Sequence, residues 1–128
     1  MFLGESGSGH SVVMDGAPDQ GGRNMGARPM EMILLGLGGC ASFDVMTMLQ
    51  KGRQQVSDCR VEISAQRVDA VPAVFSSIHL EFVLSGSNLK ESQVKRAVEL
   101  SAEKYCSASI MLEAAGVEIS HSYRIQAP

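Results

Sequence analysis

Residues 29–52 read PMEMILLGLGGCASFDVMTMLQKG, and this stretch decides the fold. The apolar side chains from Met32 to Leu37 cover nearly every direction around a helix axis, and Pro29 suits the first turn of a helix. Lys51 complements the helix dipole at the other end, where Gly52 can end the helix. Because a helix that is apolar all round is a buried helix, we expect a central core helix from Pro29 to about Gly52.

Three glycines interrupt this apolar helix. Gly36, Gly38 and Gly39 each weaken it by about 1 kcal/mol relative to alanine. Three such losses close together need a structural reason, and the close approach of another backbone is the natural one. We therefore expect tight packing around this part of the helix.

Outside this helix the strand patterns come in adjacent pairs rather than alternating with helices. Apolar and polar side chains alternate in the strands, whereas the helices carry apolar stripes. The resulting order, β-β-α-β-β-α-α-β, predicts an α+β fold with antiparallel sheet, and 128 residues suit a single domain spanning residues 1–128. The expected strands are a pair within 2–14, then 56–68, 78–84 and 117–125, and the further helices are 89–105 and 107–115.

Composition excludes several classes of partner. The net charge is −3, and no basic cluster or aromatic strand face indicates nucleic-acid binding. No uninterrupted apolar run reaches the length of roughly 20 residues that a membrane span needs, so no membrane is expected. The start of the chain, MFLGE, lacks the features of a signal peptide, which favours the cytoplasm.

Two of the three cysteines lie where chemistry is favoured over packing. Cys40 lies inside the apolar helix, and Cys106 lies at the end of the second helix, at the start of a short one, where a thiol pKa is expected to fall. A buried free cysteine is more often a small core residue, so each thiol alone is weak evidence. Cys59 lies on the apolar face of a strand and is assigned no role, and Asp44 follows Cys40 by one turn, where a carboxylate would raise a thiol pKa.

The sequence gives little indication of a metal site. It has no Cys-x-x-Cys or His-x-x-x-His spacing, and no cofactor is expected. His10 lies in a turn, His79 lies on a polar strand face, and His121 interrupts an apolar face as a core histidine would. Metal binding is the minor interpretation for all three histidines.

Three stretches resemble one known family. They are Ala27 to Met32, Gly38-Gly39-Cys40, and Leu100 to Ser107 (LSAEKYCS). Together they resemble the OsmC/Ohr family of thiol-dependent hydroperoxide reductases, and most closely its YhfA-type branch. The resemblance covers nearly the whole chain in element order, although the chain begins without a strand that relatives carry.

The resemblance implies both an assembly and a reaction. It implies an intertwined homodimer in which the sheets wrap around long central helices, with Cys40 as the peroxidatic cysteine, Cys106 as the resolving cysteine and Glu31 as a further catalytic residue. Organic hydroperoxides would be the substrates, and a dithiol such as a lipoyl group would be the reductant. No metal or flavin would be required.

Two differences from the family pattern leave a second interpretation open. In the family's peroxidases a glutamate directly follows the motif proline, and an arginine lies near the N-terminus. Here Met30 follows Pro29 and Glu31 comes one residue later, while Arg23 and Arg28 match the arginine by no motif. Glu31 and Cys40 are also nine positions apart, which places them on opposite faces of a straight helix. The alternative is a non-catalytic, redox-responsive or small-molecule-binding dimer, and a purely structural relic of the fold is a weaker third interpretation.

Overall fold

The structure is a computed structural model that describes residues 1–128. The chain divides into two compact units, Met1–Gly36 and Leu37–Pro128, and each unit is described by itself. The boundary falls within the long helix α1 (Pro29–Lys51), which contributes its first residues to one unit and the rest to the other. The expectation of a single domain stays a prediction.

In the first unit, a buried carboxylate orders the glycine-rich loop. Strands β1 (Phe2–Glu5) and β2 (Ser11–Met14) form an antiparallel hairpin, and the short 3-10 helix η1 (Pro18–Gln20) follows. Asp15 accepts hydrogen bonds from the backbone N–H groups of Gly16, Arg23 and Met25, at 2.9, 3.0 and 3.1 Å. These donors hold the pKa of the Asp15 carboxyl well below its usual range, because they favour its charged form.

Helix α1 has the bounds that the sequence predicts, but it is not buried on all sides. Its buried side chains recur at about every fourth residue, which gives one stripe rather than a full circle. Phe43, on the other side, is 80% exposed in the single chain. The expectation of all-round burial is therefore wrong for one chain, because one sheet can cover only one face of a helix. The buried stripe consists of Leu37, Gly38, Ala41, Val45 and Leu49.

Helix α1 would also be long and apolar enough to cross a membrane, with a mean hydropathy of 1.7 over its most apolar 18-residue window. This finding rests on length and composition only, and the core helix of a soluble protein passes the same test. The stripe on α1 packs against strand β3 (Gln55–Arg67), as a core helix would. The absence of a membrane partner stays a prediction.

The glycines of α1 differ in their surroundings. A Cβ atom on Gly38 would lie 2.7 Å from Cδ1 of Ile63 and 3.2 Å from Cγ1 of Val61, so this glycine lets strand β3 approach the helix closely. Gly36 and Gly39 have open space where a Cβ would lie. Tight packing is therefore confirmed at Gly38, where side chains rather than another backbone make the approach.

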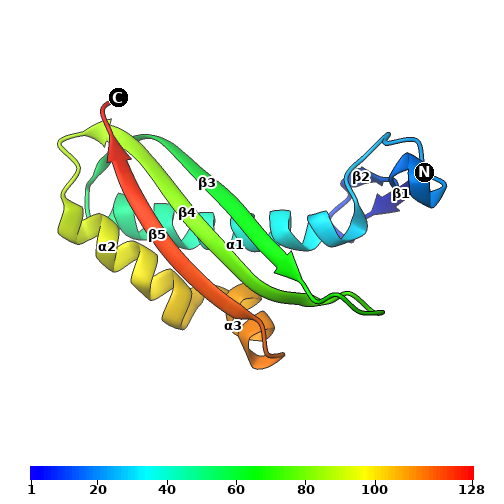
Figure 1. Cartoon of the computed structure of the whole chain (residues 1–128). Helices are drawn as coiled ribbons and strands as arrows, with labels where there is room; N and C mark the ends of the chain where they lie inside the picture. Colours follow the sequence, from blue (N-terminus) through cyan, green and yellow to red (C-terminus); the bar gives the residue numbers. More distant parts are fainter. The chain divides into compact units, whose positions relative to one another are not determined.

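Three strands form the sheet of the second unit, in the order β3–β4–β5 (Figure 1). Strand β4 (Phe75–Ser87) is antiparallel to β3, as predicted, whereas β5 (Glu118–Gln126) is parallel to β4. The prediction of purely antiparallel pairing is wrong at β5, because a long helical connection returns the chain to the same end of the sheet. This connection comprises α2 (Glu91–Leu100), the π-helix η2 (Ser101–Tyr105) and α3 (Ser107–Ala114).

One face of this sheet forms the core. Ile78, Leu80, Phe82 and Leu84 alternate along β4, and none is more than 1% exposed. Phe82 lies opposite Val61 on β3 and Tyr123 on β5, which continue the same face across the sheet. Helix α1 packs on this face through Gly38, and the residues of α2 and α3 that border β5 adjoin its Ile119 and Tyr123.

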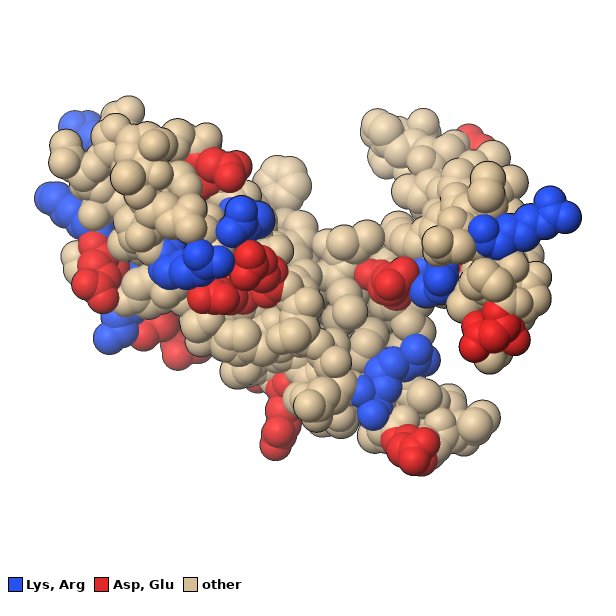
Figure 2. All heavy atoms as spheres, turned by 45° about the horizontal axis from the view of Figure 1, so that its top comes forward, with Lys and Arg blue, Asp and Glu red and all other residues tan.

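The opposite face is mostly polar, with Val83 as a buried apolar exception. The two ring nitrogens of His79 lie 2.7 and 2.8 Å from the hydroxyls of Ser120 and Ser122, which confirms the polar position predicted for this histidine. Arg124 on β5 forms ion pairs with Glu81 on the adjacent strand β4 and with Glu62 on β3. Basic and acidic side chains are interspersed on the face drawn in Figure 2, and neither sign gathers into one large patch there.

The core face predicts where truncation is costly. Phe82→Ala should lower the free energy of unfolding by about 3–5 kcal/mol, because the ring is fully buried and its removal leaves a cavity. Glu81→Gln, its neighbour on the polar face, should cost less than about 1 kcal/mol, as is usual for an exposed ion pair. Urea unfolding of both variants checks this, and equal losses would contradict the assignment of faces.

Candidate functional site

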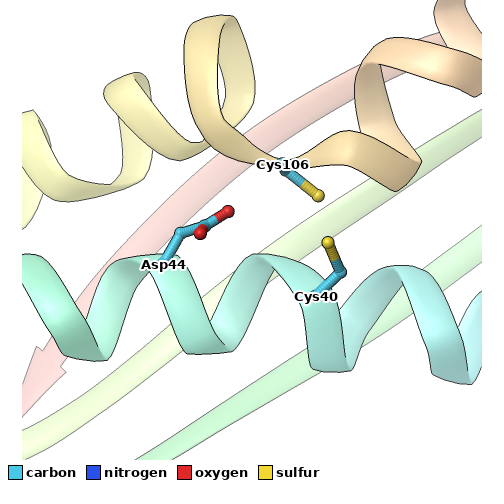
Figure 3. Close-up of side chains that lie close together, drawn as sticks. All are labelled: Cys40, Asp44 and Cys106. Carbon is cyan, nitrogen blue, oxygen red and sulfur yellow. The ribbon is translucent and has the colours of Figure 1, made fainter.

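Three reactive side chains meet between α1 and the start of α3 in the second unit. The sulfur atoms of Cys40 and Cys106 and a carboxylate oxygen of Asp44 all lie within 4.8 Å of one another. Figure 3 shows the two thiols pointing toward each other, with the Asp44 carboxylate directed into the same space. The structure thus brings together the two cysteines that the sequence selects.

Helix geometry places two members of the cluster. Cys40 and Asp44 are four residues apart on α1, and residues with this spacing lie above one another on one helix face. Both side chains are partly buried. The sequence identifies Asp44 as the carboxylate nearest to Cys40, but its approach to Cys106 depends on tertiary packing.

The third member, Cys106, is positioned by a π-helix. The sequence predicts a continuous helix to Tyr105, but α2 ends at Leu100 and the five residues of η2 adopt a wider turn. The backbone N–H of Cys106 donates to the carbonyl of Ser101 at 2.8 Å, a bond that spans five residues instead of four. Such π segments inside helices occur frequently at functional sites.

Ser101 joins this π-helix to α1. Its side chain is buried, and its hydroxyl lies 3.3 Å from the carbonyl of Ala41 and 3.4 Å from Oδ2 of Asp44. Its single proton is shared between these two acceptors. The residue whose carbonyl binds Cys106 therefore also contacts the helix that carries Cys40 and Asp44.

Burial controls the ionisation of Cys106. The residue caps α3, and its sulfur accepts a hydrogen bond from the N–H of Ser109 at 3.4 Å, which favours the thiolate. Burial, with smaller contributions from Cys40 and Asp44, nevertheless raises the pKa of the Cys106 thiol from its ordinary value of 9.0 to about 11. The expectation of a lowered pKa at this helix start is therefore wrong, because desolvation outweighs the single N–H donor.

The two thiols differ in their access to solvent. Cys106 has no exposed surface, whereas Cys40 is partly exposed. Both are free, and a disulfide between them would require the sulfur atoms to approach to roughly 2.05 Å. A dissolved reactant can therefore reach Cys40 first.

The other predicted residues lie outside this cluster. The Glu31 carboxylate accepts a hydrogen bond from the backbone N–H of Arg28 at 2.8 Å in the first unit, as a residue in the first turn of a helix can. Its catalytic role stays a prediction. Cys59 lies on β3, where burial raises the pKa of its thiol, and it takes no part in the cluster.

Two cavities lie near the helices of the second unit. One of about 460 Å³ starts at Asp44 and runs between α1 and α2, with Met48 and Leu100 among its apolar lining residues and Lys51 and Arg96 among its basic ones. The larger one, of about 810 Å³, lies between α2, α3 and β5 and includes neither thiol. Neither Cys40 nor Cys106 lines the smaller cavity either, but Asp44 of the cluster does, and we therefore consider the smaller cavity the relevant one.

His121 is half-buried and lines the larger cavity. This histidine lies on the core face of β5, as the sequence predicts, and burial lowers the pKa of its imidazole. The cluster of Cys40, Asp44 and Cys106 contains no histidine. Its three donor groups could nevertheless hold a metal ion, which the sequence spacing does not indicate.

Comparisons with known proteins agree with these features. The family model described as OsmC-like protein matches residues 21–122. Protein YhfA of Escherichia coli (strain K12) is 50% identical over 129 residues, which cover 98% of this chain and 90% of that protein. The crystal structure of a hypothetical protein from Aquifex aeolicus VF5 matches with a TM-score of 0.84 at 28% identity, covering 99% of this chain and 88% of that one.

More distant structures share the fold. An organic hydroperoxide resistance protein OsmC from Legionella pneumophila superimposes with a TM-score of 0.70 at 14% identity, over 93% of this chain and 85% of that one. At this identity the likeness concerns the fold alone. The family model covers most of the chain, and YhfA matches almost all of it. The chain therefore belongs to the OsmC-like family, in its YhfA-type branch.

Proposed function

We propose that the protein is a thiol-dependent peroxidase that reduces organic hydroperoxides. The observation that carries this proposal is the pair of facing thiols, of which Cys40 is partly exposed and Cys106 is buried. The thiol that attacks the peroxide must be accessible to it, whereas the resolving thiol needs to contact only the oxidised form of the first cysteine. A fold neighbour from Legionella pneumophila is named as an organic hydroperoxide resistance protein, which supports the same chemistry.

The reaction proceeds in three balanced steps. The Cys40 thiolate attacks the terminal oxygen of the hydroperoxide, the O–O bond breaks, and the alkoxide takes a proton and leaves as the alcohol. The resulting Cys40 sulfenic acid condenses with the Cys106 thiol, which forms a disulfide and releases water. A dithiol, for which we propose a lipoyl-type compound, then exchanges with this disulfide, becomes oxidised and restores both thiols.

The environment of Cys106 favours this order of events. Its raised pKa keeps the thiol protonated at neutral pH, so it does not compete with Cys40 as the first nucleophile. The Asp44 carboxylate contributes to this effect by its negative charge. The disulfide would form after only a short side-chain movement, because the two sulfur atoms already lie within 4.8 Å.

The neighbouring cavity favours an organic substrate. Its volume of about 460 Å³ far exceeds what hydrogen peroxide needs, and its walls combine apolar with basic side chains. An alkyl chain would lie along Met48 and Leu100, while Lys51 and Arg96 would suit a polar or anionic end group. The peroxide group would then lie at the Asp44 end, beside the thiols.

A homodimer would account for the uncovered side of α1. Phe43 is 80% exposed, and the open space at Gly39 lies one turn before it on the same side of the helix. Such a stripe permits close contact with a second helix, and apolar exposure of this kind marks interaction sites. We propose a second copy of the chain as the partner. Glu31, assigned to the site by resemblance, would then serve the thiol of the partner subunit.

We propose the cytoplasm as the location, because a thiol pair that must be reduced in each cycle suits a reducing compartment.

A second function is the alternative to a peroxidase. A redox-responsive dimer would form the same disulfide without efficient turnover. A reactive thiolate is stabilised by a nearby cation, whereas the group beside these thiols is the Asp44 carboxylate, and this favours the second function. Turnover separates the two functions, whereas thiol oxidation alone does not.

Removal of the nucleophile tests the proposed activity. With cumene hydroperoxide as substrate and dihydrolipoamide as reductant, Cys40→Ser should reduce turnover by more than about a thousand-fold, because the covalent step is lost. Without the reductant, Cys106→Ser should consume one equivalent of peroxide and leave a sulfenic acid at Cys40 that dimedone traps, because no second thiol condenses with it. Cys59→Ser, outside the cluster, is the matched control and should retain activity. Stoichiometric consumption of peroxide by the wild-type protein would instead favour the redox-responsive dimer.

The pKa of Cys106 can be measured by thiolate absorbance. In the double variant Cys40→Ser/Cys59→Ser the midpoint should lie between 9.0 and about 11, because burial, the largest cause of the shift, remains. The same protein without Cys106 supplies the tyrosine baseline. Adding Asp44→Asn should lower the midpoint, whereas Asp58→Asn should not.

The raised pKa of Cys106 also determines how the free energy of unfolding changes with pH. The protonated thiol is favoured in the folded state, so its stabilising contribution is complete below pH 9 and is lost as the pH rises toward 11. A midpoint at or below 9.0 would contradict the desolvation of Cys106.

The exposed stripe on α1 predicts the interface. Phe43→Asp should convert a dimer to monomers, because it would place a charge in an apolar contact. Sedimentation equilibrium measures the mass of each species. Val71→Asp, at an apolar residue that is 100% exposed in a loop, is the matched control and should leave the mass unchanged. A wild-type mass equal to one chain would rule the dimer out.

A further inference from the structure

We propose that the reduced cluster of Cys40, Asp44 and Cys106 binds a zinc ion through two thiolates and one carboxylate, with the fourth position left to water. This site would be a property of the resting, reduced protein. It goes beyond the peroxidase reaction and does not depend on peroxide turnover.

The donor types select the ion. Thiolates are soft ligands that favour zinc over magnesium or calcium, and a single carboxylate completes a three-residue set of the kind that zinc accepts with one position open. Cys40 and Asp44 supply two donors from one face of α1, four residues apart, a spacing that also brings two ligands to one ion in helical metal sites. Cys106 supplies the third from the N-cap of α3.

The distances suit this geometry. The three donor atoms lie within 4.8 Å of one another. Around a tetrahedral ion with bonds of about 2.3 Å to sulfur and about 2.0 Å to oxygen, donor atoms lie roughly 3.5–4 Å apart. Small rotations of the three side chains therefore suffice to enclose an ion, and no backbone element has to move.

Neighbouring groups orient two of the three donors. The Ser101 hydroxyl lies 3.4 Å from Oδ2 of Asp44, and the N–H of Ser109 donates to the Cys106 sulfur at 3.4 Å. Outer hydrogen bonds of this kind hold metal ligands in place. Cys106 is fully buried, whereas Cys40 and Asp44 are partly exposed, so their side of the cluster provides the entry path and the place for the water.

Binding is an exchange of protons for the metal, without oxidation. Two zinc–sulfur bonds form, two S–H bonds break, and two protons leave to the solvent. The two thiolates and the carboxylate carry a charge of −3, which the ion reduces to −1. Because both sulfur atoms are then bound to zinc, the ion and the Cys40–Cys106 disulfide exclude each other.

Cobalt and zinc titrations of the full, reduced chain test the site. One equivalent of Co²⁺ should give the visible bands of a tetrahedral site and a sulfur-to-cobalt charge-transfer band, and Zn²⁺ should displace it. Protein with the Cys40–Cys106 disulfide should bind neither ion, which provides a test without any substitution. Two protons should be released per zinc bound in weakly buffered solution.

Variants assign the ligands. Cys40→Ser and Cys106→Ser should each remove the charge-transfer band of the two-thiolate site, and Asp44→Asn should weaken zinc binding at least about ten-fold, since even outer-shell partners of a metal ligand contribute that much. Cys59→Ser and Asp58→Asn are the matched controls and should bind as the wild type does. Circular dichroism confirms that each variant is folded.

Three results would overturn the site: no cobalt spectrum from the reduced protein, equal binding by the disulfide form, or unchanged affinity in Asp44→Asn. If the protein turns over hydroperoxide but binds no zinc, the zinc site is contradicted and the proposed peroxidase function is supported. If the protein binds zinc but does not turn over hydroperoxide, the zinc site is supported and the proposed peroxidase function is contradicted. Where both hold, zinc should slow the reaction of the reduced protein with one equivalent of hydroperoxide in the absence of the dithiol, which itself binds zinc, and a chelator should restore the rate.

Discussion

The arrangement of the reactive groups depends on the hydrogen bonds of one buried residue, Ser101. Its carbonyl accepts the N–H of Cys106 across the π turn, while its hydroxyl contacts the carbonyl of Ala41 and the carboxylate of Asp44. A buried hydroxyl without partners would be costly, so this position specifies how α1 and the crossover connection meet. Cys40 and Cys106 lie on the two segments that Ser101 joins.

Much of the second unit could be predicted from hydropathy alone. The alternation in β3 and β4 identifies both strands and their core face, and the apolar run with its proline and lysine gives the bounds of α1. The parallel pairing of β5 was missed because strand order along the chain does not specify direction. The sequence held a signal nevertheless, since the two helical segments between β4 and β5 are long enough for a crossover.

The site shows where such reasoning ends. The cysteine blocks select Cys40 and Cys106, but no periodicity in the sequence marks the π turn, because a bond spanning five residues leaves no pattern of its own. Asp44 could be placed near Cys40 by helix spacing, whereas its position beside Cys106 is a consequence of tertiary packing. The predicted fall in the pKa of Cys106 was wrong for the same reason, because the sequence shows where a helix begins but not how deeply the thiol is buried.

The π-helix has a consequence for how this branch can change over time. A π turn holds one residue more than the α-helical turn it replaces, and each residue of an α-helix advances the chain by about 100° around the axis. Because the π turn already accommodates that extra residue, one further residue inserted within residues 101–105 would turn Cys106 away from α1 by roughly that angle. Both cysteines would still be present in an alignment, yet the thiol pair would be gone. Segment length is thus inherited as part of the site, alongside the identity of its residues.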